Sequence, residues 1–143
     1  MFRAISLAVT LALGVSVAYA ESAAIAQRQA ILKSFGEAAK DPGAMLKGDI
    51  KFDLAKVQHF LHTVEEGAPK LKALFPADSK TGGNTKALPA IWEKHDQFIA
   101  GYDKLAADAK AALVAIKDEA SFKTELPKVF GDCGGCHRQF RAQ

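Results

Sequence analysis

The residues best suited to chemistry in this sequence lie near its C-terminus, in the segment Cys133-Gly134-Gly135-Cys136-His137. This CxxCH pattern is typical of covalent haem attachment, in which two thiols add to the vinyl groups of the macrocycle. Residues three positions apart on a helix share one face, about 5 Å apart along its axis, so both thiols can reach one haem. The motif therefore predicts one covalently attached haem c, with Cys133 and Cys136 as thioether links and His137 as the axial iron ligand.

Three other uses of a cysteine pair compete with this interpretation. A thioredoxin-like redox pair usually opens a helix within a βαβ unit, and the sequence shows no such unit. A structural zinc site requires four nitrogen or sulfur ligands, which two cysteines and scattered histidines supply poorly. A disulfide between Cys133 and Cys136 would close a very small loop and add little stability. The spacing favours haem attachment over all three.

The first twenty residues have the pattern of a secretory signal peptide. Met1-Phe2-Arg3 supplies a positive start, residues 4–17 form an uncharged apolar run, and Ala18-Tyr19-Ala20 is a small-x-small cleavage signal. An uncleaved anchor is the alternative, but a comfortable membrane span needs roughly 20 apolar residues. We expect cleavage of residues 1–20 and export of a mature domain, residues 21–143, to the periplasm, with no stable membrane anchor.

The composition is that of one packed globular domain. The chain has 143 residues, of which 49% are hydrophobic and 24% charged. Its 19 Lys and Arg residues and 16 Asp and Glu residues give a net charge of +3, and the two signs alternate along the chain. Since nucleic-acid-binding proteins concentrate basic residues in a stripe, we expect no nucleic-acid partner.

Apolar residues recur at intervals of three and four, which is typical of amphipathic helices, and no segment alternates with a period of two. The clearest run extends from Leu54 to Phe75, with Asp53 as a candidate N-cap. Gly67 and Pro69 are expected to kink or briefly interrupt it. Three further runs cover roughly residues 22–39, 88–116 and 121–141. Four such helices bury their apolar faces most economically in an antiparallel all-α four-helix bundle, with helices crossing at roughly 20°.

The position of the motif in the last expected helix resembles cytochrome c′, a family of class II c-type cytochromes. Arg28-Gln29 in the first helix and Ala87-Leu88-Pro89-Ala90-Ile91-Trp92 at the start of the third add to the resemblance. In ordinary small cytochromes c, by contrast, CxxCH lies near the N-terminus. The resemblance covers essentially the whole expected mature chain. It implies a four-helix bundle with one covalent haem in its core, a capacity for electron transfer and, commonly, a homodimer.

The resemblance also implies roles for individual residues. Arg141 matches the family's proximal arginine, and its position four residues after His137 places both on one helical face. Other matches lie at the haem edge: Arg28, Gln29 and Thr85 on the propionate side, and Trp92 close to the macrocycle. A guanidinium is well suited to bidentate pairing with a carboxylate. The residues themselves leave open a solvated charge for Arg28, a helix cap for Thr85 and core packing for Trp92.

The same resemblance implies that Leu32 lies on the distal side of the haem, and the Leu32 side chain has no lone pair to donate to the iron. Low-spin relatives such as cytochrome c-556 carry a Met in this part of the first helix. The nearest Met here is Met45, roughly 20 Å further along a continuous helix, so it should miss the iron. We expect a five-coordinate, high-spin haem. Further residues have expected places: Phe35 and Phe60 along the pocket, His95 as a hydrogen-bonded interfacial residue, and His59 and His62 flanking the seam of the second helix.

Three functions are compatible with these features. The first is a haem protein that binds NO or CO in an apolar distal pocket, which offers O₂ no hydrogen bond. The second is an electron carrier with an unidentified periplasmic redox partner, in the low-spin form a relative of cytochrome c-556. The third is a haem enzyme acting on NO or peroxide, although a peroxidase ordinarily uses a distal His or Arg and Leu32 stands there instead. We expect the first, without enzymatic activity, while turnover of NO stays open.

Overall fold

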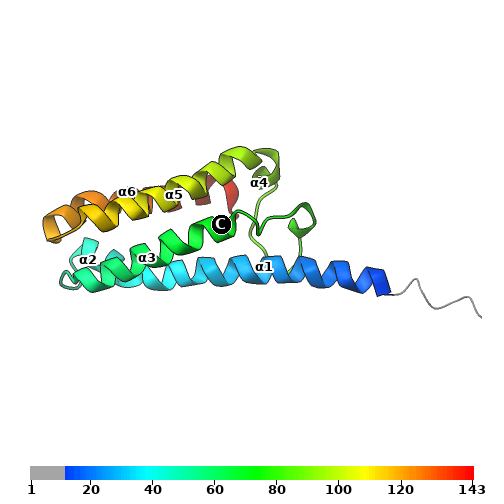
Figure 1. Cartoon of the computed structure of the whole chain (residues 1–143), viewed down its shortest axis with the longest axis horizontal. Coiled ribbons are helices and arrows are strands. Elements are labelled where there is room, and N and C mark those ends of the chain that lie inside the picture. Colours follow the sequence, from blue (N-terminus) through cyan, green and yellow to red (C-terminus); the bar gives the residue numbers. More distant parts are fainter. Residues whose placement is uncertain (1–11) are drawn as a thin grey trace, which may run out of the picture.

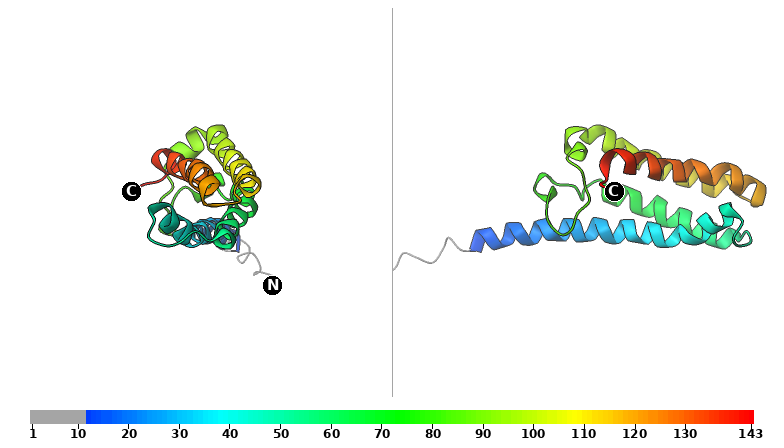
Figure 2. Two further views of the ribbon diagram at one scale, coloured as in Figure 1. Left: turned by 90° about the vertical axis from the view of Figure 1, so that its left-hand side faces the viewer. Right: turned by 180° about the vertical axis from the view of Figure 1, so that it is seen from behind.

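In the computed structural model of this chain, residues 12–143 are described, with side chains from residue 23 onward. The helices are α1 (Ala12–Ala38), α2 (Lys40–Lys47), α3 (Leu54–Leu71), α4 (Ala90–Glu93), α5 (His95–Ala115) and α6 (Glu119–Phe140), with a short 3₁₀ helix, η1 (Ala77–Ser79). The four long helices α1, α3, α5 and α6 lie side by side as a bundle, with the long loop and α4 at one end and α2 at the other (Figures 1 and 2). The all-α four-helix bundle is confirmed.

The bundle is not packed equally between all of its neighbours. Helix α3 packs against both α1 and α5, and α5 packs against α6, whereas α1 and α6 make little direct backbone contact. An isolated antiparallel bridge between Ala87 and Arg141 ties the end of the long loop to the end of α6. This arrangement leaves space between α1 and α6 at the end of the bundle where α6 finishes.

The seam of α3 forms as the periodicity predicts. The Asp53 carboxylate accepts a 3.2 Å hydrogen bond from the backbone N–H of Lys56, which caps the helix. The apolar positions of the seam are fully buried: Val57, Leu61, Val64, Ala68 and Leu71. The helix continues through Gly67 and Pro69 to Leu71, so the expected interruption is wrong. Proline lacks an N–H, but packing of the buried seam on both neighbouring helices holds the final turn in place.

Other element boundaries differ from the sequence-based expectation. Helix α1 begins earlier and runs through the expected cleavage position, while residues 1–11 of the expected signal peptide lie outside the described residues. The segment Asp41-Pro42-Gly43 lies inside a separate helix, α2, since Pro42 occupies its first turn, where a missing N–H is harmless. The expected third helix is divided at Lys94, whose φ of −120° and ψ of 43° are not helical. A capping box between Asp118 and Ser121 starts α6 two residues earlier than expected.

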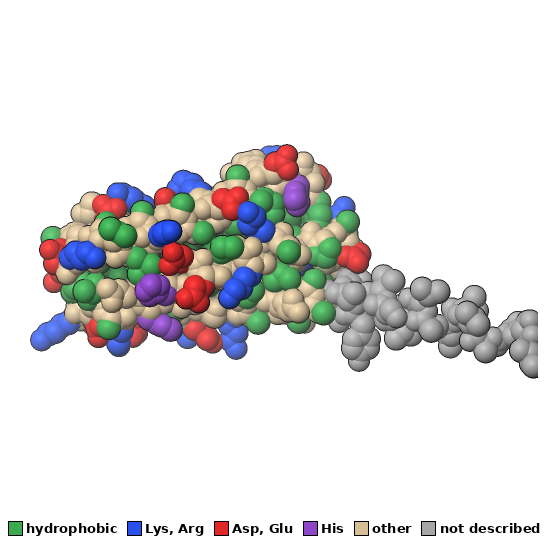
Figure 3. Space-filling view, viewed as in Figure 1, with side chains coloured by type: hydrophobic (Ala, Val, Ile, Leu, Met, Phe, Trp, Pro, Cys, Tyr) green, Lys and Arg blue, Asp and Glu red, His purple; other side chains and the backbone are tan. Residues whose placement is uncertain are grey.

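The surface carries charges of both signs. Figure 3 shows basic and acidic side chains interspersed over the visible face, rather than gathered in one basic patch. Of the helices in the described part of the chain, none is both long and apolar enough to span a bilayer.

Candidate haem site

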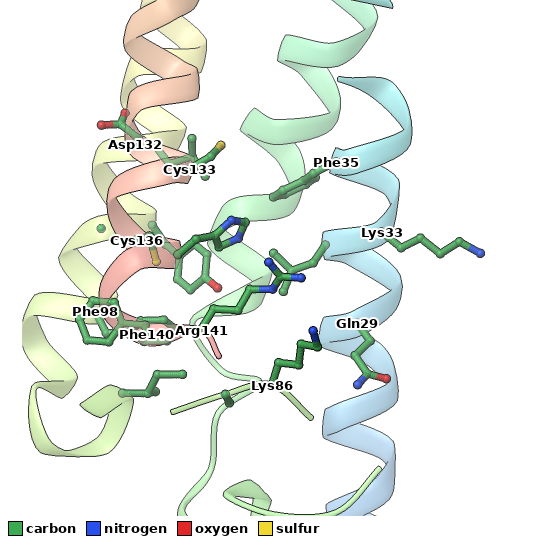
Figure 4. A pocket seen from close by; sticks show the side chains of 18 of the residues that line it. Gln29, Lys33, Phe35, Lys86, Phe98, Asp132, Cys133, Cys136, Phe140 and Arg141 are labelled. Carbon is green, nitrogen blue, oxygen red and sulfur yellow. The ribbon is translucent and has the colours of Figure 1, made fainter. Parts of the chain in front are cut away.

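A cavity of about 570 Å³ lies at the junction of α1, α3, α5, α6 and the end of the long loop (Figure 4). Its size is within the range of about 300–1,000 Å³ usual for ligand pockets. Most of its wall is apolar, with contributions from all four long helices: Leu32, Phe35, Phe60, Phe98, Leu105, Phe130 and Phe140. Polar and charged side chains gather at its mouth: Gln29, Lys33, Asn84, Thr85, Lys86 and Arg141.

The CxxCH residues meet in this cavity. Cys133, Cys136 and His137 all line it from α6, and the two thiols are free rather than joined in a disulfide. Burial raises the pKa of the Cys133 thiol, and burial together with Cys133 raises the pKa of Cys136 to about 11. Reactive redox pairs instead have a lowered thiol pKa, which argues against a thioredoxin-like role. Within the described residues, His, Cys, Asp and Glu form no group of three that could hold a metal ion.

His137 is prepared to act as a ligand. Its partial burial, and next the positive charge of Arg141, lower the pKa of the imidazole. The neutral imidazole is the form that binds iron, so this shift favours ligation at neutral pH. Arg141, labelled in Figure 4, lines the cavity as His137 does, and its charge acts on the imidazole, which agrees with the proximal arginine that the resemblance implies.

The remaining expected site residues are divided between the cavity and the structure around it. Leu32, Gln29 and Thr85 line the cavity, and so do Phe35 and Phe60. The Gln29 side chain donates a 3.1 Å hydrogen bond to the carbonyl oxygen of Gly83, and so links α1 to the loop. Helix α1 thus contributes both apolar residues, Leu32 and Phe35, and polar ones, Gln29 and Lys33, to the cavity wall.

Arg28 lies outside the cavity wall and is only 2% exposed, so the alternative of a solvated charge is wrong. Its Nη1 donates to the carbonyl oxygen of Leu74 (3.0 Å) and to Ser79 Oγ (2.8 Å). Its Nη2 donates to the carbonyl oxygen of Ser79 (2.9 Å) and to Thr85 Oγ1 (2.8 Å). Burial lowers the pKa of Arg28, although an arginine stays charged. In the described part of the chain no carboxylate pairs with it, and Thr85 joins it to the cavity mouth, so contact with a propionate remains a prediction.

Trp92 does not line the cavity. Its indole N–H donates to the carbonyl oxygens of Phe75 (3.0 Å) and Pro76 (3.2 Å), and its ring meets the ring of Phe75 edge-on. Trp92 thus has a packing role, in which it fastens α4 to the loop, and its place close to the haem stays a prediction.

Among the described residues of the cavity wall there is no methionine and no histidine other than His137. The expected interfacial role of His95 is wrong: its side chain is 52% exposed beside Asp96, because the backbone turns at Lys94 and α5 begins there. His59 and His62 lie on the exposed side of α3, as expected. Met45 is buried in α2, at the other end of the bundle from the cavity mouth, and does not line the cavity (Figure 1).

Several lining residues were not anticipated from the sequence, among them Tyr102 and Asp132. Tyr102 is buried, and burial raises the pKa of its phenol well above the usual range. Nζ of Lys104 forms ion pairs with Oδ1 of Asp132 at 2.6 Å and with Oδ2 of Asp108 at 2.5 Å. The i,i+4 spacing of Lys104 and Asp108 predicts their pairing, but only the packing of α5 against α6 adds Asp132.

A family model described as Cytochrome C′ matches residues 23–141. The chain belongs to the cytochrome c′ family. It is 52% identical to cytochrome c′ of Rhodopseudomonas palustris over 141 residues, which cover 99% of this chain and 97% of that protein. It is 35% identical to cytochrome c-556 of Agrobacterium fabrum, over 82% of this chain and 80% of that protein. The solved structure of cytochrome c′ from Rhodopseudomonas palustris matches with a TM-score of 0.82 and 56% identity, covering 84% of this chain and 96% of that one.

Membership of the cytochrome c′ family makes this chain a monohaem c-type cytochrome, and the cofactor of the family is covalently attached haem c. The cavity fits that group because it combines an apolar interior, a polar mouth and the full CxxCH motif on one wall. Cys133 and Cys136 would hold the haem and His137 would ligate its iron. When bound, the iron supplies one-electron chemistry between its ferric and ferrous states. The protein's own contribution is a largely apolar wall and an imidazole whose pKa is lowered by burial and by Arg141.

Proposed function

We propose that this chain is a periplasmic cytochrome with a five-coordinate, high-spin haem iron that binds NO and CO, and that it can also transfer single electrons. One observation carries the proposal: in the described part of the chain, the cavity wall contains no methionine and no histidine other than His137. On the expected distal side the cavity presents Leu32 and Phe35 from α1 and Phe60 from α3, none of which can donate a lone pair to iron.

The polarity of that side supports the choice of ligand. An apolar roof offers no hydrogen bond to O₂, whose binding depends on one, whereas NO and CO need less help from the pocket. Lys33 and Lys86, the charged lining residues of α1 and the loop, are exposed, whereas Leu32, Phe35 and Phe60 on the expected distal side are apolar. Small neutral gases are therefore the ligands that this cavity suits best.

A six-coordinate, low-spin electron carrier is the second candidate, because the chain is also 35% identical to a cytochrome c-556. That form needs a second protein ligand, and Met45 in α2 does not supply one at the cavity wall. A haem enzyme acting on NO is less well supported, since the α1 side of the cavity offers no His or Arg for acid–base work.

Export and assembly belong to the same proposal. The apolar run and the cleavage signal within residues 1–20 support a signal peptide, and the family match begins at residue 23, just after it. The resemblance to cytochromes c′ supports a homodimer. The periplasmic redox partner of this cytochrome is unidentified.

Optical spectroscopy of the exported holoprotein tests the proposal. We expect high-spin spectra in both oxidation states and a clear spectral change when CO is added to the ferrous protein. A low-spin spectrum in the wild-type protein contradicts the open iron site and favours the cytochrome c-556-like form. Sedimentation of the same sample reports whether it is a dimer.

A further inference from the structure

A glycine in α3 lies directly against an aromatic ring of α1. A Cβ atom built on Gly67 would lie 2.4 Å from Cε1 and 2.7 Å from Cζ of Phe35, and 3.2 Å from Cγ2 of Ile31. Contacts below 3.0 Å are essentially never seen for a real Cβ atom. Any other residue at position 67 therefore requires the Phe35 ring to move.

Helix formation does not explain this glycine, because alanine is the better helix former at an interior helical position. Other glycines in the helices have open space around the same point: no atom lies within 4 Å of the Cβ position at Gly36, Gly101 or Gly131. The close contact with an aromatic ring is thus a particular property of Gly67, and its effect must be sought at Phe35.

Phe35 is part of the cavity wall. Its side chain is 7% exposed and lines the cavity with Leu32 and Phe60. Figure 4 shows its ring reaching from α1 into the bundle, opposite Cys133 and Cys136 on α6. One edge of the ring meets Gly67, and the open space beside the ring is the cavity itself.

We infer that Gly67 and Phe35 together set the size limit for a ligand on the α1 side of the haem. Glycine lets the ring lie back against α3, which leaves room beside Leu32. A methyl group at position 67 pushes the ring into the cavity, because the rest of its surroundings are close-packed core. The pair admits a diatomic gas and excludes bulkier ligands. This inference rests on the proposed function, since it concerns the same open iron site.

The test compares CO association in ferrous holoproteins after flash photolysis. Gly67→Ala should slow association by about tenfold, as overpacking reduces the room beside the iron. Phe35→Leu should speed association and strengthen binding of n-butyl isocyanide, a bulkier ligand. The double variant should return close to the wild-type rate. Gly131→Ala is the matched control and should leave the rate unchanged, because nothing lies within 4 Å of its Cβ position.

Crystal structures of the wild-type and Gly67→Ala holoproteins give a second measurement, independent of gas binding. The Phe35 ring should be displaced into the cavity in the variant, and a ring that has not moved overturns the inference. So does a double variant that stays as slow as Gly67→Ala. If Gly67→Ala does not fold, Phe35→Leu still decides, because unchanged isocyanide binding overturns the size limit. A wild-type protein that binds no CO overturns the proposed function and this inference together, before any variant is compared.

Discussion

The Nη2 of Arg28 donates a 2.8 Å hydrogen bond to Oγ1 of Thr85, which joins a buried charge in α1 to the loop at the mouth of the cavity. The guanidinium also lies over the ring of Phe75, 4.5 Å from its centroid. Through these contacts Arg28 holds the long loop against α1. The loop in turn places Thr85, Lys86 and Ala87 along the cavity.

Replacing Arg28 with Ala should therefore destabilise the protein by about 3 kcal/mol, because carbonyl and hydroxyl oxygens on the loop lose their donor. Urea unfolding measures the loss. Arg138→Ala is the control: it removes an exposed arginine in α6 and should change stability by less than about 0.5 kcal/mol. Equal losses in the two variants would show that the buried contacts contribute nothing particular.

Leu32→Met should convert the haem to a low-spin, six-coordinate form, because it places a thioether sulfur on the α1 side of the cavity. The affinity for CO should fall by at least about tenfold, since the gas must displace a protein ligand. Optical spectra and CO titration measure both effects. Met45→Leu, a swap that nearly conserves volume, should leave the spectrum unchanged. Loss of a low-spin signal in Met45→Leu would instead identify Met45 as a ligand.

The Asp132 and Asp108 carboxylates should respond to pH in opposite directions. Burial, followed by the hydrogen bond with Asp108, raises the pKa of Asp132 in the folded protein despite the pairing with Lys104. The folded state therefore binds this proton up to a higher pH than the unfolded chain, in which the Asp pKa is about 3.9. The bound proton adds to the stability of the folded state at pH values below about 3.9, and this contribution is lost as pH rises. Asp132→Asn cannot ionise, so its stability relative to wild type should increase from pH 4 to pH 7.

Asp108 provides the matched comparison. Its hydrogen bond from Lys104 lowers its pKa in the folded protein, so its contribution is present at neutral pH and disappears in acid. Asp108→Asn should therefore lose stability relative to wild type as pH rises from about 2 to about 5, across the unfolded-state pKa of about 3.9. Chemical unfolding from about pH 2 to about pH 7 measures both variants, and the same sign of change in both as pH rises would contradict the assignment.

Covalent attachment has a direct mass readout. Exported wild-type protein should carry an increment of about 616 Da, the mass of haem, on a chain that begins near Glu21. Cys133→Ser combined with Cys136→Ser should abolish the increment, whereas each single variant should keep a thioether. Zinc or a disulfide in place of haem predicts no such increment in the wild-type protein.

Local patterns account for what the sequence by itself determined. The CxxCH motif needs only residues within one turn to bring two thiols and an imidazole to one face, and the heptad-like seam from Leu54 to Leu71 needs only helical periodicity. The Asp53 cap is equally local, since it acts on an N–H three residues away. Haem attachment and the all-α fold therefore followed from short-range spacing, whereas the family was indicated by a resemblance in the position of the motif and in Arg28-Gln29.

Tertiary structure decided what depends on distant partners. The hydrogen-bond acceptors of Arg28 lie 46 to 57 residues further along the chain, in a loop without regular spacing. No pattern in the sequence therefore predicts that this charge is buried. The approach of Gly67 to Phe35 and the exposure of His95 are likewise set by how helices pack and where one helix is divided. The periodicity of a sequence predicts which face of a helix is apolar. The atoms that this face contacts are determined only in the packed bundle, because close packing depends on the neighbouring helices together.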